Sequence, residues 1–161
     1  MMDGIAALDA DLRDLYQDLI LDHGKHPRNF RKPGDVSREA LGHNPLCGDR
    51  LIVYLTLDAD GTIVDAAFQG SGCAISTASA SMMTEMLKGK TRAQADTLFK
   101  FMHMACTGAG EIKTAGLTQD EIDRLHALAG VRHYPMRVKC ATLAWHTMQA
   151  ALSALPKAST E

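Results

Sequence analysis

Two residues that can bind a metal lie two positions apart in the segment 44–49 (NPLCGD) of this chain. Pro45 and Gly48 are typical of a turn, so Cys47 and Asp49 can point from one loop toward a common centre. A thiolate and a carboxylate placed together in this way can ligate a cation. The pair therefore indicates either a metal site or a reactive thiol.

Two further cysteines lie where a thiol ionises easily. Cys73 ends the segment 70–73 (GSGC), whose glycines permit a sharp turn between a predicted strand and a predicted helix. The N-terminus of a helix stabilises a thiolate, and Cys140 is likewise predicted at a helix start, after the basic segment 135–139 (PMRVK). Cys106, in the segment 104–108 (MACTG), lacks such neighbours, and we predict a packing or loop role for it.

Three thiolates and one carboxylate form a ligand set that suits tetrahedral zinc. Zinc has no redox chemistry of its own, so it would hold the thiolates and tune their reactivity. The carboxylate is the hardest member of the set and the least well matched to the sulfur ligands. No Cys-x-x-Cys pair is present, so spacing alone does not separate a metal site from a group of active thiols.

Charged side chains near the cysteines have two interpretations each. His43, four residues before Cys47, either stands beside the site or is a solvated loop histidine. Lys139 either stabilises a thiolate or a persulfide or is simply exposed, and Arg137 is a weaker candidate for the same role. Composition and spacing leave both interpretations open for each residue.

The cysteines must be held in place by strands and helices. Residues 51–57 and 62–68 are rich in β-branched and aromatic side chains and flank an Asp-Gly turn, which predicts a β-hairpin; residues 38–43 form a weaker strand. Helical periodicity follows in the rest of the chain. The predicted helices cover residues 8–20, with a stop at 23–24, and residues 75–86, 92–104, 118–128 and 140–155. Strands followed by helices indicate an α+β fold, in which helices cover one face of a small antiparallel sheet of about three strands.

Length and composition predict a single domain over residues 1–161, with 156–161 as a frayed C-terminal tail. The formal net charge is −2 and the basic residues are scattered, which gives no electrostatic argument for binding nucleic acid. No apolar run is long enough to span a bilayer, and residues 1–12 lack the features of a signal peptide. We therefore expect a cytoplasmic protein whose four cysteines do not form a disulfide framework.

Five segments together resemble one family. Residues 47–49 (CGD), 70–76 (GSGCAIS) and 139–145 (KCATLAW) resemble the SufU branch of the U-type iron–sulfur cluster assembly proteins. Residues 15–23 (LYQDLILDH) and 26–30 (HPRNF) are similar to the N-terminal helix and loop of the same family. The resemblance extends from about residue 12 to residue 155, which is nearly the whole chain.

The resemblance implies a U-type (SufE/NifU-like) fold and a zinc ion held by Cys47, Asp49, Cys73 and Cys140. Cys47 is then the catalytic residue, which accepts sulfur as a persulfide. The implied donor is a cysteine desulfurase of the SufS type, whose pyridoxal phosphate stays with that partner. The implied activity is that of a sulfurtransferase that works with the desulfurase and supplies a downstream cluster scaffold of the SUF system.

Two alternatives accompany this interpretation. The related IscU-type scaffold, on which a cluster is built, has a histidine before its last cysteine and a Leu-Pro-Pro-Val-type motif, where this chain has Lys139 and residues 134–137 (YPMR). The segment between Cys73 and Cys140 is also longer than in that branch, by roughly residues 106–117, and all three departures favour sulfur transfer. Iron or an iron–sulfur cluster is then the alternative to zinc. The second alternative is a structural zinc module that docks partners and has no reactive thiol.

Overall fold

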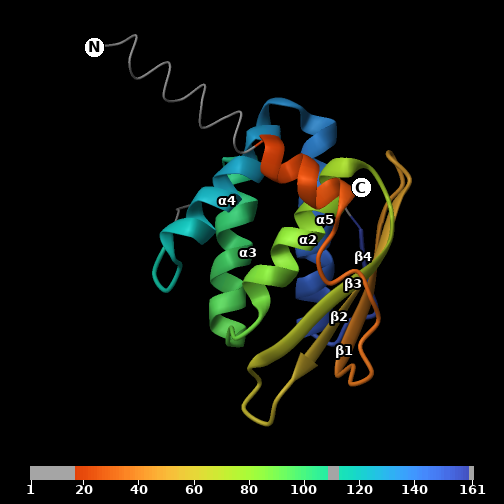
Figure 1. Cartoon of the computed structure of the whole chain (residues 1–161), viewed down its shortest axis with the longest axis vertical. Helices are drawn as coiled ribbons and strands as arrows, with labels where there is room; N and C mark the ends of the chain where they lie inside the picture. Colours follow the sequence, from red (N-terminus) through yellow and green to blue (C-terminus); the bar gives the residue numbers. More distant parts are fainter. Residues whose placement is uncertain (1–16, 109–112, 160–161) are drawn as a thin grey trace.

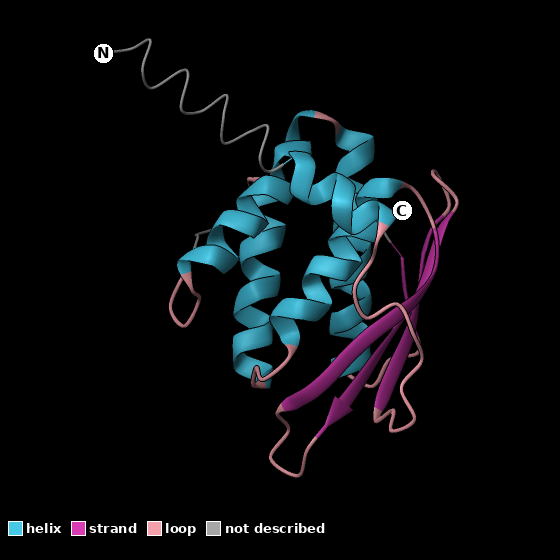
Figure 2. Cartoon of the chain, in the orientation of Figure 1, coloured by secondary structure: helices cyan, strands magenta, loops and turns pink. Residues whose placement is uncertain are grey.

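The computed structural model describes residues 17–108 and 113–159. A helical segment at 17–25 is followed by a β-meander, a run of helices and a last short strand. Helices gather on one side of the sheet (Figures 1 and 2), as predicted for an α+β fold. The labelled elements are β1 (Arg38–Asn44), β2 (Asp49–Leu57), β3 (Ile63–Ser71), α2 (Ala74–Leu87), α3 (Arg92–Thr107), α4 (Gln119–Ala129), α5 (Pro135–Leu152) and β4 (Lys157–Ser159).

The sheet has four strands in the order β3-β2-β1-β4 and is mixed, not an antiparallel sheet of three strands. β1 and β3 both pair antiparallel with β2, whereas β4 runs parallel to β1. The prediction of a frayed tail is therefore wrong for residues 157–159, while 160–161 lie outside the described residues. Three residues after a proline carry no strand pattern of their own. They are ordered because the edge of β1 offers unpaired groups, and Leu41 N–H donates to Pro156 O at 2.9 Å.

The core lies between the sheet and the helices. β2 contributes Val53 and Leu55, both fully buried, and α2 and α5 pack directly on the sheet. α3 and α4 lie behind these two helices (Figure 1). Except for exposed Met136, the methionines of these helices fill the core, as their helical spacing predicts. The buried ones are Met82, Met83, Met86, Met102, Met104 and Met148.

The helix starts decide where the site residues stand. Cys73 is the N-cap of α2, and its sulfur accepts the Ser76 N–H, which agrees with the predicted strand-to-helix turn. α4 begins with the predicted capping box. α5 begins at Pro135, five residues earlier than predicted, because proline is favoured in the first turn of a helix. Cys140 therefore lies in the second turn of α5 and not at its start.

The N-terminal helix is described from residue 17 to residue 25, and the first part of the predicted range 8–20 lies outside the described residues. Buried His23 anchors this helix to α2, since its Nδ1 lies 2.7 Å from Ser81 Oγ. None of the helices in the described parts of the chain combines the length and apolar character needed to cross a bilayer.

Candidate metal centre

The loop between β1 and β2 presents Cys47. Asn44 and Asp49 are paired across the two strands, so only four residues, 45–48, lie between them. The loop can turn so tightly because Gly48 adopts a left-handed backbone, with φ of 72°. Cys47 is half-buried, whereas both residues that close the loop are fully buried. The loop thus holds a partly accessible thiol above two buried polar side chains.

Asp49 has one carboxylate oxygen in use and one free. Its Oδ1 accepts the Cys73 N–H at 2.9 Å, which ties β2 to the start of α2. Its Oδ2 is buried and has no hydrogen-bond partner among the described residues. A buried carboxylate oxygen without a partner is costly unless a cation satisfies it. The free, buried Oδ2 therefore makes Asp49 a candidate metal ligand on structural grounds.

Cys140 completes a compact group with these two residues. Its Sγ lies 3.3 Å from Cys47 Sγ, and the ligand atoms of Cys47, Asp49 and Cys140 all lie within 4.8 Å of one another. Burial raises the pKa of the Cys140 thiol, and the neighbouring side chains of Cys47, Asp49 and Cys73 raise it further. Without a cation the thiol therefore stays protonated. A positive metal ion reverses this preference and makes the thiolate the stable form.

Cys73 stands at the edge of the group. Its Sγ is not among the three ligand atoms that lie mutually within 4.8 Å, and it serves instead as the N-cap of α2. It still influences its neighbours, because the Cys73 sulfur, together with contacts to Cys140, raises the pKa of the Arg137 guanidinium. The structure thus brings three predicted ligands together and holds the fourth next to them.

The donor set fits a small cation with a preference for sulfur. Three thiols and one carboxylate are available, and a tetrahedral zinc site uses four such ligands. The unpartnered Asp49 Oδ2 and the close contact of the Cys47 and Cys140 sulfurs are both relieved when a cation lies between them. The residues present therefore fit zinc, with Cys47, Asp49, Cys73 and Cys140 as the ligands it would use.

Sequence patterns did not reveal the roles of Asn44 and Gly72 at this site, and they placed Arg137 too low among the candidates. Asn44 is buried, and its Nδ2 donates to Cys140 Sγ at 3.8 Å. Arg137, ranked below Lys139 from sequence, is the cation whose guanidinium pKa is raised by the sulfurs of Cys73 and Cys140. A Cβ atom at Gly72 would lie 2.7 Å from Asp49 Oδ1, so this position needs glycine to let the carboxylate approach. Had the start of α5 been predicted at Pro135, the spacing of three residues between Arg137 and Cys140 would have indicated that the two side chains are neighbours on one helix.

Two other residues considered from the sequence, His43 and Cys106, lie away from the site. His43 is exposed, and strand alternation places it on the opposite face of the sheet from Asn44, so it does not stand beside the thiols. Cys106 is buried near the end of α3 and is part of the hydrophobic core, as expected for a packing role. Burial raises the pKa of its thiol to about 11.

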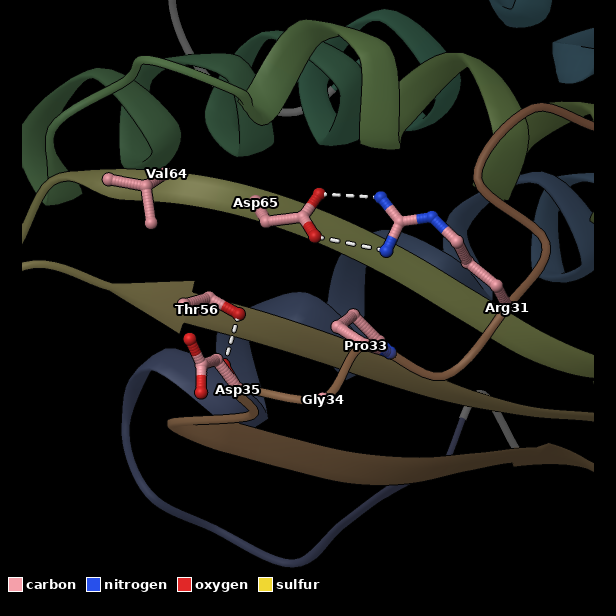
Figure 3. Close-up of a pocket in the computed structure, with 7 residues that line it drawn as sticks. All are labelled: Arg31, Pro33, Gly34, Asp35, Thr56, Val64 and Asp65. Carbon is pink, nitrogen blue, oxygen red and sulfur yellow. Dashed lines mark hydrogen bonds and ion pairs between the residues drawn. The ribbon is translucent and has the colours of Figure 1, made fainter.

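A surface pocket lies away from the cysteines, where residues 31–35 cross β2 and β3 (Figure 3). Two of its charged groups are already paired, because the Arg31 guanidinium donates to both oxygens of Asp65 at 2.8 and 3.0 Å. Thr56 Oγ1 likewise donates to the Asp35 carbonyl. In the part of the chain that the structure describes, the pocket brings together no group of potential metal ligands like that of Cys47, Asp49 and Cys140, and the cysteine centre is the candidate functional site.

Known proteins share both this sequence and this fold. Residues 15–141 match the family described as NifU-like N-terminal domain. The zinc-dependent sulfurtransferase SufU of Bacillus subtilis is 41% identical over 146 residues, which cover 89% of this chain and 92% of that protein. The iron–sulfur cluster assembly scaffold protein IscU of Streptococcus pyogenes is 37% identical over 141 residues, covering 88% of this chain and 84% of that protein.

A solved structure agrees with these relatives. FiSufU from Fervidobacterium islandicum, described as an iron–sulfur cluster assembly scaffold protein for the SUF system, superimposes with a TM-score of 0.73. It is 34% identical, and the match covers 83% of this chain and 93% of that chain. The U-type fold expected from the sequence is therefore confirmed.

Proposed function

Because this chain belongs to the NifU-like N-terminal domain family, we propose that it is a zinc-dependent sulfurtransferase of iron–sulfur cluster assembly. In this role Cys47 accepts sulfur from the persulfide of a SufS-type cysteine desulfurase. The sulfur then passes to a downstream cluster scaffold of the SUF system. The protein works in the cytoplasm, as its sequence predicts.

One observation carries the proposal. Cys47 is the only one of the three clustered ligands that is partly exposed, while Asp49 and Cys140 are fully buried beneath it. A sulfur carrier needs this division, because the buried ligands keep the centre assembled while the exposed thiol meets the donor. A bound zinc ion supplies a charge that keeps the thiols deprotonated without taking part in redox chemistry.

The transfer itself is a thiol–persulfide exchange. The Cys47 thiolate attacks the terminal sulfur of the donor persulfide, and the sulfur–sulfur bond of the donor breaks. The donor cysteine leaves as a thiolate, and Cys47 keeps the transferred sulfur as its own persulfide. The sulfurs of Cys73 and Cys140 raise the pKa of the Arg137 guanidinium, and this cation can stabilise the anion that forms beside it.

Persulfide trapping tests the proposal. The protein is mixed with a SufS-type desulfurase and L-cysteine, treated with an alkylating probe, and mapped by peptide mass spectrometry. We expect one extra sulfur atom on Cys47 and none on Cys106. The Cys47→Ser variant should lose the label, and Cys106→Ser should keep it. A zinc-loaded protein that takes up no sulfur, or takes it up on Cys106, would rule the proposal out and favour a structural zinc module.

Scaffolding is the second candidate, favoured by relatives that carry the name of iron–sulfur cluster assembly scaffold protein IscU. The same thiols can bind iron, so ligand identity does not separate the two functions. Anaerobic incubation with ferrous iron, a desulfurase and cysteine separates them. A sulfur carrier keeps its zinc and its persulfide, whereas a scaffold develops the visible absorption of an iron–sulfur cluster on the chain.

A further inference from the structure

Asn44 lies where the loop of Cys47 meets the helix of Cys140. It is the last residue of β1, is fully buried, and stands opposite Asp49 in the register of β1 and β2. Its side chain projects to the same face of the sheet as that of Asp49, because directly opposed residues share a face. The two residues therefore close the loop and line the metal centre together.

Asn44 binds the loop on both sides of Cys47. Its backbone carbonyl accepts the Gly48 N–H at 2.9 Å, and its side-chain Oδ1 accepts the Leu46 N–H at 3.3 Å. The second bond is an Asx-turn, which fixes the chain two residues beyond the asparagine. The residues before and after Cys47 are thus held by one anchor.

The other end of the same side chain reaches the second thiol. Asn44 Nδ2 donates to Cys140 Sγ at 3.8 Å across a sequence separation of 96 residues. An uncharged amide suits this place, because an N–H donor stabilises a thiolate without adding charge. A carboxylate here would add a negative charge beside Asp49 and the thiols. An aliphatic side chain would leave the Leu46 N–H without its partner.

We propose that Asn44 is a positioning residue that fixes the loop of Cys47 relative to the Cys140 thiol and thereby sets the geometry of the metal centre. The proposal rests on the zinc site of the proposed function and adds the residue that assembles it. Asn44 acts through Cys47 and Cys140 and needs no contact with the transferred sulfur, the donor or the metal. Its loss should therefore change metal affinity and ligand geometry beyond what its contribution to folding explains.

Three variants and two metals test this role. Asn44→Ala removes both side-chain bonds. Asn44→Ser keeps a hydroxyl for the Leu46 N–H but is too short to reach Cys140. The matched control is Thr84→Ala, which also removes a buried polar group: Thr84 Oγ1 donates to Ser81 O at 2.7 Å and accepts from Asn29. Thr84 is 11 residues after Cys73 in α2, about 16 Å away at 1.5 Å per residue.

Zinc affinity is measured by competition with a chromophoric chelator, and cobalt(II) is substituted so that its visible spectrum reports the ligand geometry. We expect Asn44→Ala to bind zinc about tenfold more weakly than wild type and to show an altered cobalt spectrum. Asn44→Ser should lie between the two, and Thr84→Ala should match wild type in both measurements. If Asn44→Ala and Thr84→Ala have the same zinc affinity and the wild-type cobalt spectrum, Asn44 has only a packing role.

A third measurement needs no metal and keeps the two proposals separate. In metal-free protein, the alkylation rate of Cys47 reports how firmly the loop is held, with buried Cys106 as an internal reference. Loss of the anchor in Asn44→Ala, or in Asn44→Ser where the alanine variant does not fold, should speed alkylation of Cys47 relative to wild type. An unchanged rate would overturn the role of Asn44 even where wild-type protein binds zinc and accepts sulfur.

Discussion

The sulfur atoms of Cys47 and Cys140 lie 3.3 Å apart, although the two residues are 93 positions apart in the chain. One sulfur sits on the loop between β1 and β2, and the other in the second turn of α5. Two thiolates so close together repel each other unless a cation lies between them. The pair therefore makes the site sensitive both to metal removal and to oxidation.

Mild oxidation of the metal-free protein should join Cys47 to Cys140. Diamide takes up the two electrons and two protons that the thiols lose, and the sulfurs need to approach by only about 1.3 Å to reach a bond length near 2.0 Å. Peptide mapping without reductant should find this disulfide, and bound zinc should suppress it. A disulfide between Cys73 and Cys140 as the main product would contradict the arrangement described here.

Removing the Asp49 carboxylate should weaken zinc binding, and two variants separate its two oxygens. Asp49→Asn keeps an oxygen that can accept the Cys73 N–H but loses the anionic ligand, whereas Asp49→Ala loses both. We expect about a tenfold weaker zinc affinity for the asparagine variant and a larger loss, with a lower melting temperature, for alanine. Three thiolates remain in each case, so binding need not disappear. Equal zinc affinity in wild type and Asp49→Asn would exclude Asp49 as a ligand.

Gly72→Ala should damage the site without straining the backbone. The added Cβ would stand 2.7 Å from Asp49 Oδ1 and 3.2 Å from its carboxyl carbon, so the carboxylate must move. We expect weaker zinc binding at nearly unchanged helix content by circular dichroism. Gly34→Ala is the matched control, because a Cβ at that position meets nothing within 4 Å. If both variants bind zinc as wild type does, the carboxylate position is not critical.

Local signals predicted much of the fold and most of the site. The glycines before Cys73 and the Thr118 capping box predicted helix starts, and the structure confirms both. The predicted start of α5 was wrong, because proline is typical of a break before a helix but is also favoured in the first turn, where Pro135 lies. Because of that error, the sequence did not show that Arg137 and Cys140 are neighbours on one helix.

The remaining features depend on partners far away in the chain. β4 exists because β1 offers an edge, and nothing within residues 157–159 encodes that partner. The contact of Asn44 with Cys140 spans 96 residues, so the sequence shows only an asparagine before a proline. Spacing along one segment cannot reveal which distant segment will complete a site.

Cys106 should contribute to the stability of the fold and should have no role in metal binding. It is 4% exposed and lies in the core, and burial raises the pKa of its thiol to about 11. At pH 8 the native protein should therefore leave Cys106 unalkylated until urea unfolds it. Cys106→Ala should lower the free energy of unfolding by about 1 to 2 kcal/mol with unchanged zinc content. Zinc loss in this variant would mean that Cys106 belongs to the site.

His23 should make the protein less stable in mild acid. Its Nδ1 lies 2.7 Å from Ser81 Oγ, and because that oxygen accepts the Arg28 N–H, the serine hydroxyl is free to donate to an unprotonated Nδ1. The Nε2–H then faces Glu85 Oε1 at 3.5 Å. Burial lowers the pKa of His23 below its ordinary 6.5, with Arg28 as the next cause, while Glu85 opposes the shift. Native His23 is thus neutral where the unfolded chain is already protonated.

The sign of the effect follows from proton binding. Below about pH 6.5, His23 is protonated in the unfolded state but not in the native state. The free energy of unfolding therefore falls as pH decreases, by at most about 1.4 kcal/mol per pH unit. The decrease ends where His23 is protonated in the native state too. His23→Gln should be less stable at pH 7 but should lose less stability between pH 7 and pH 5. Urea titrations of both zinc-loaded proteins across this range measure the difference, in which the pH dependence of the shared metal site cancels. Half-buried His146, whose pKa is also lowered, remains in the variant and accounts for a residual slope. Parallel curves for the two proteins would show that His23 is not the neutral, buried histidine that ties the N-terminal helix to α2.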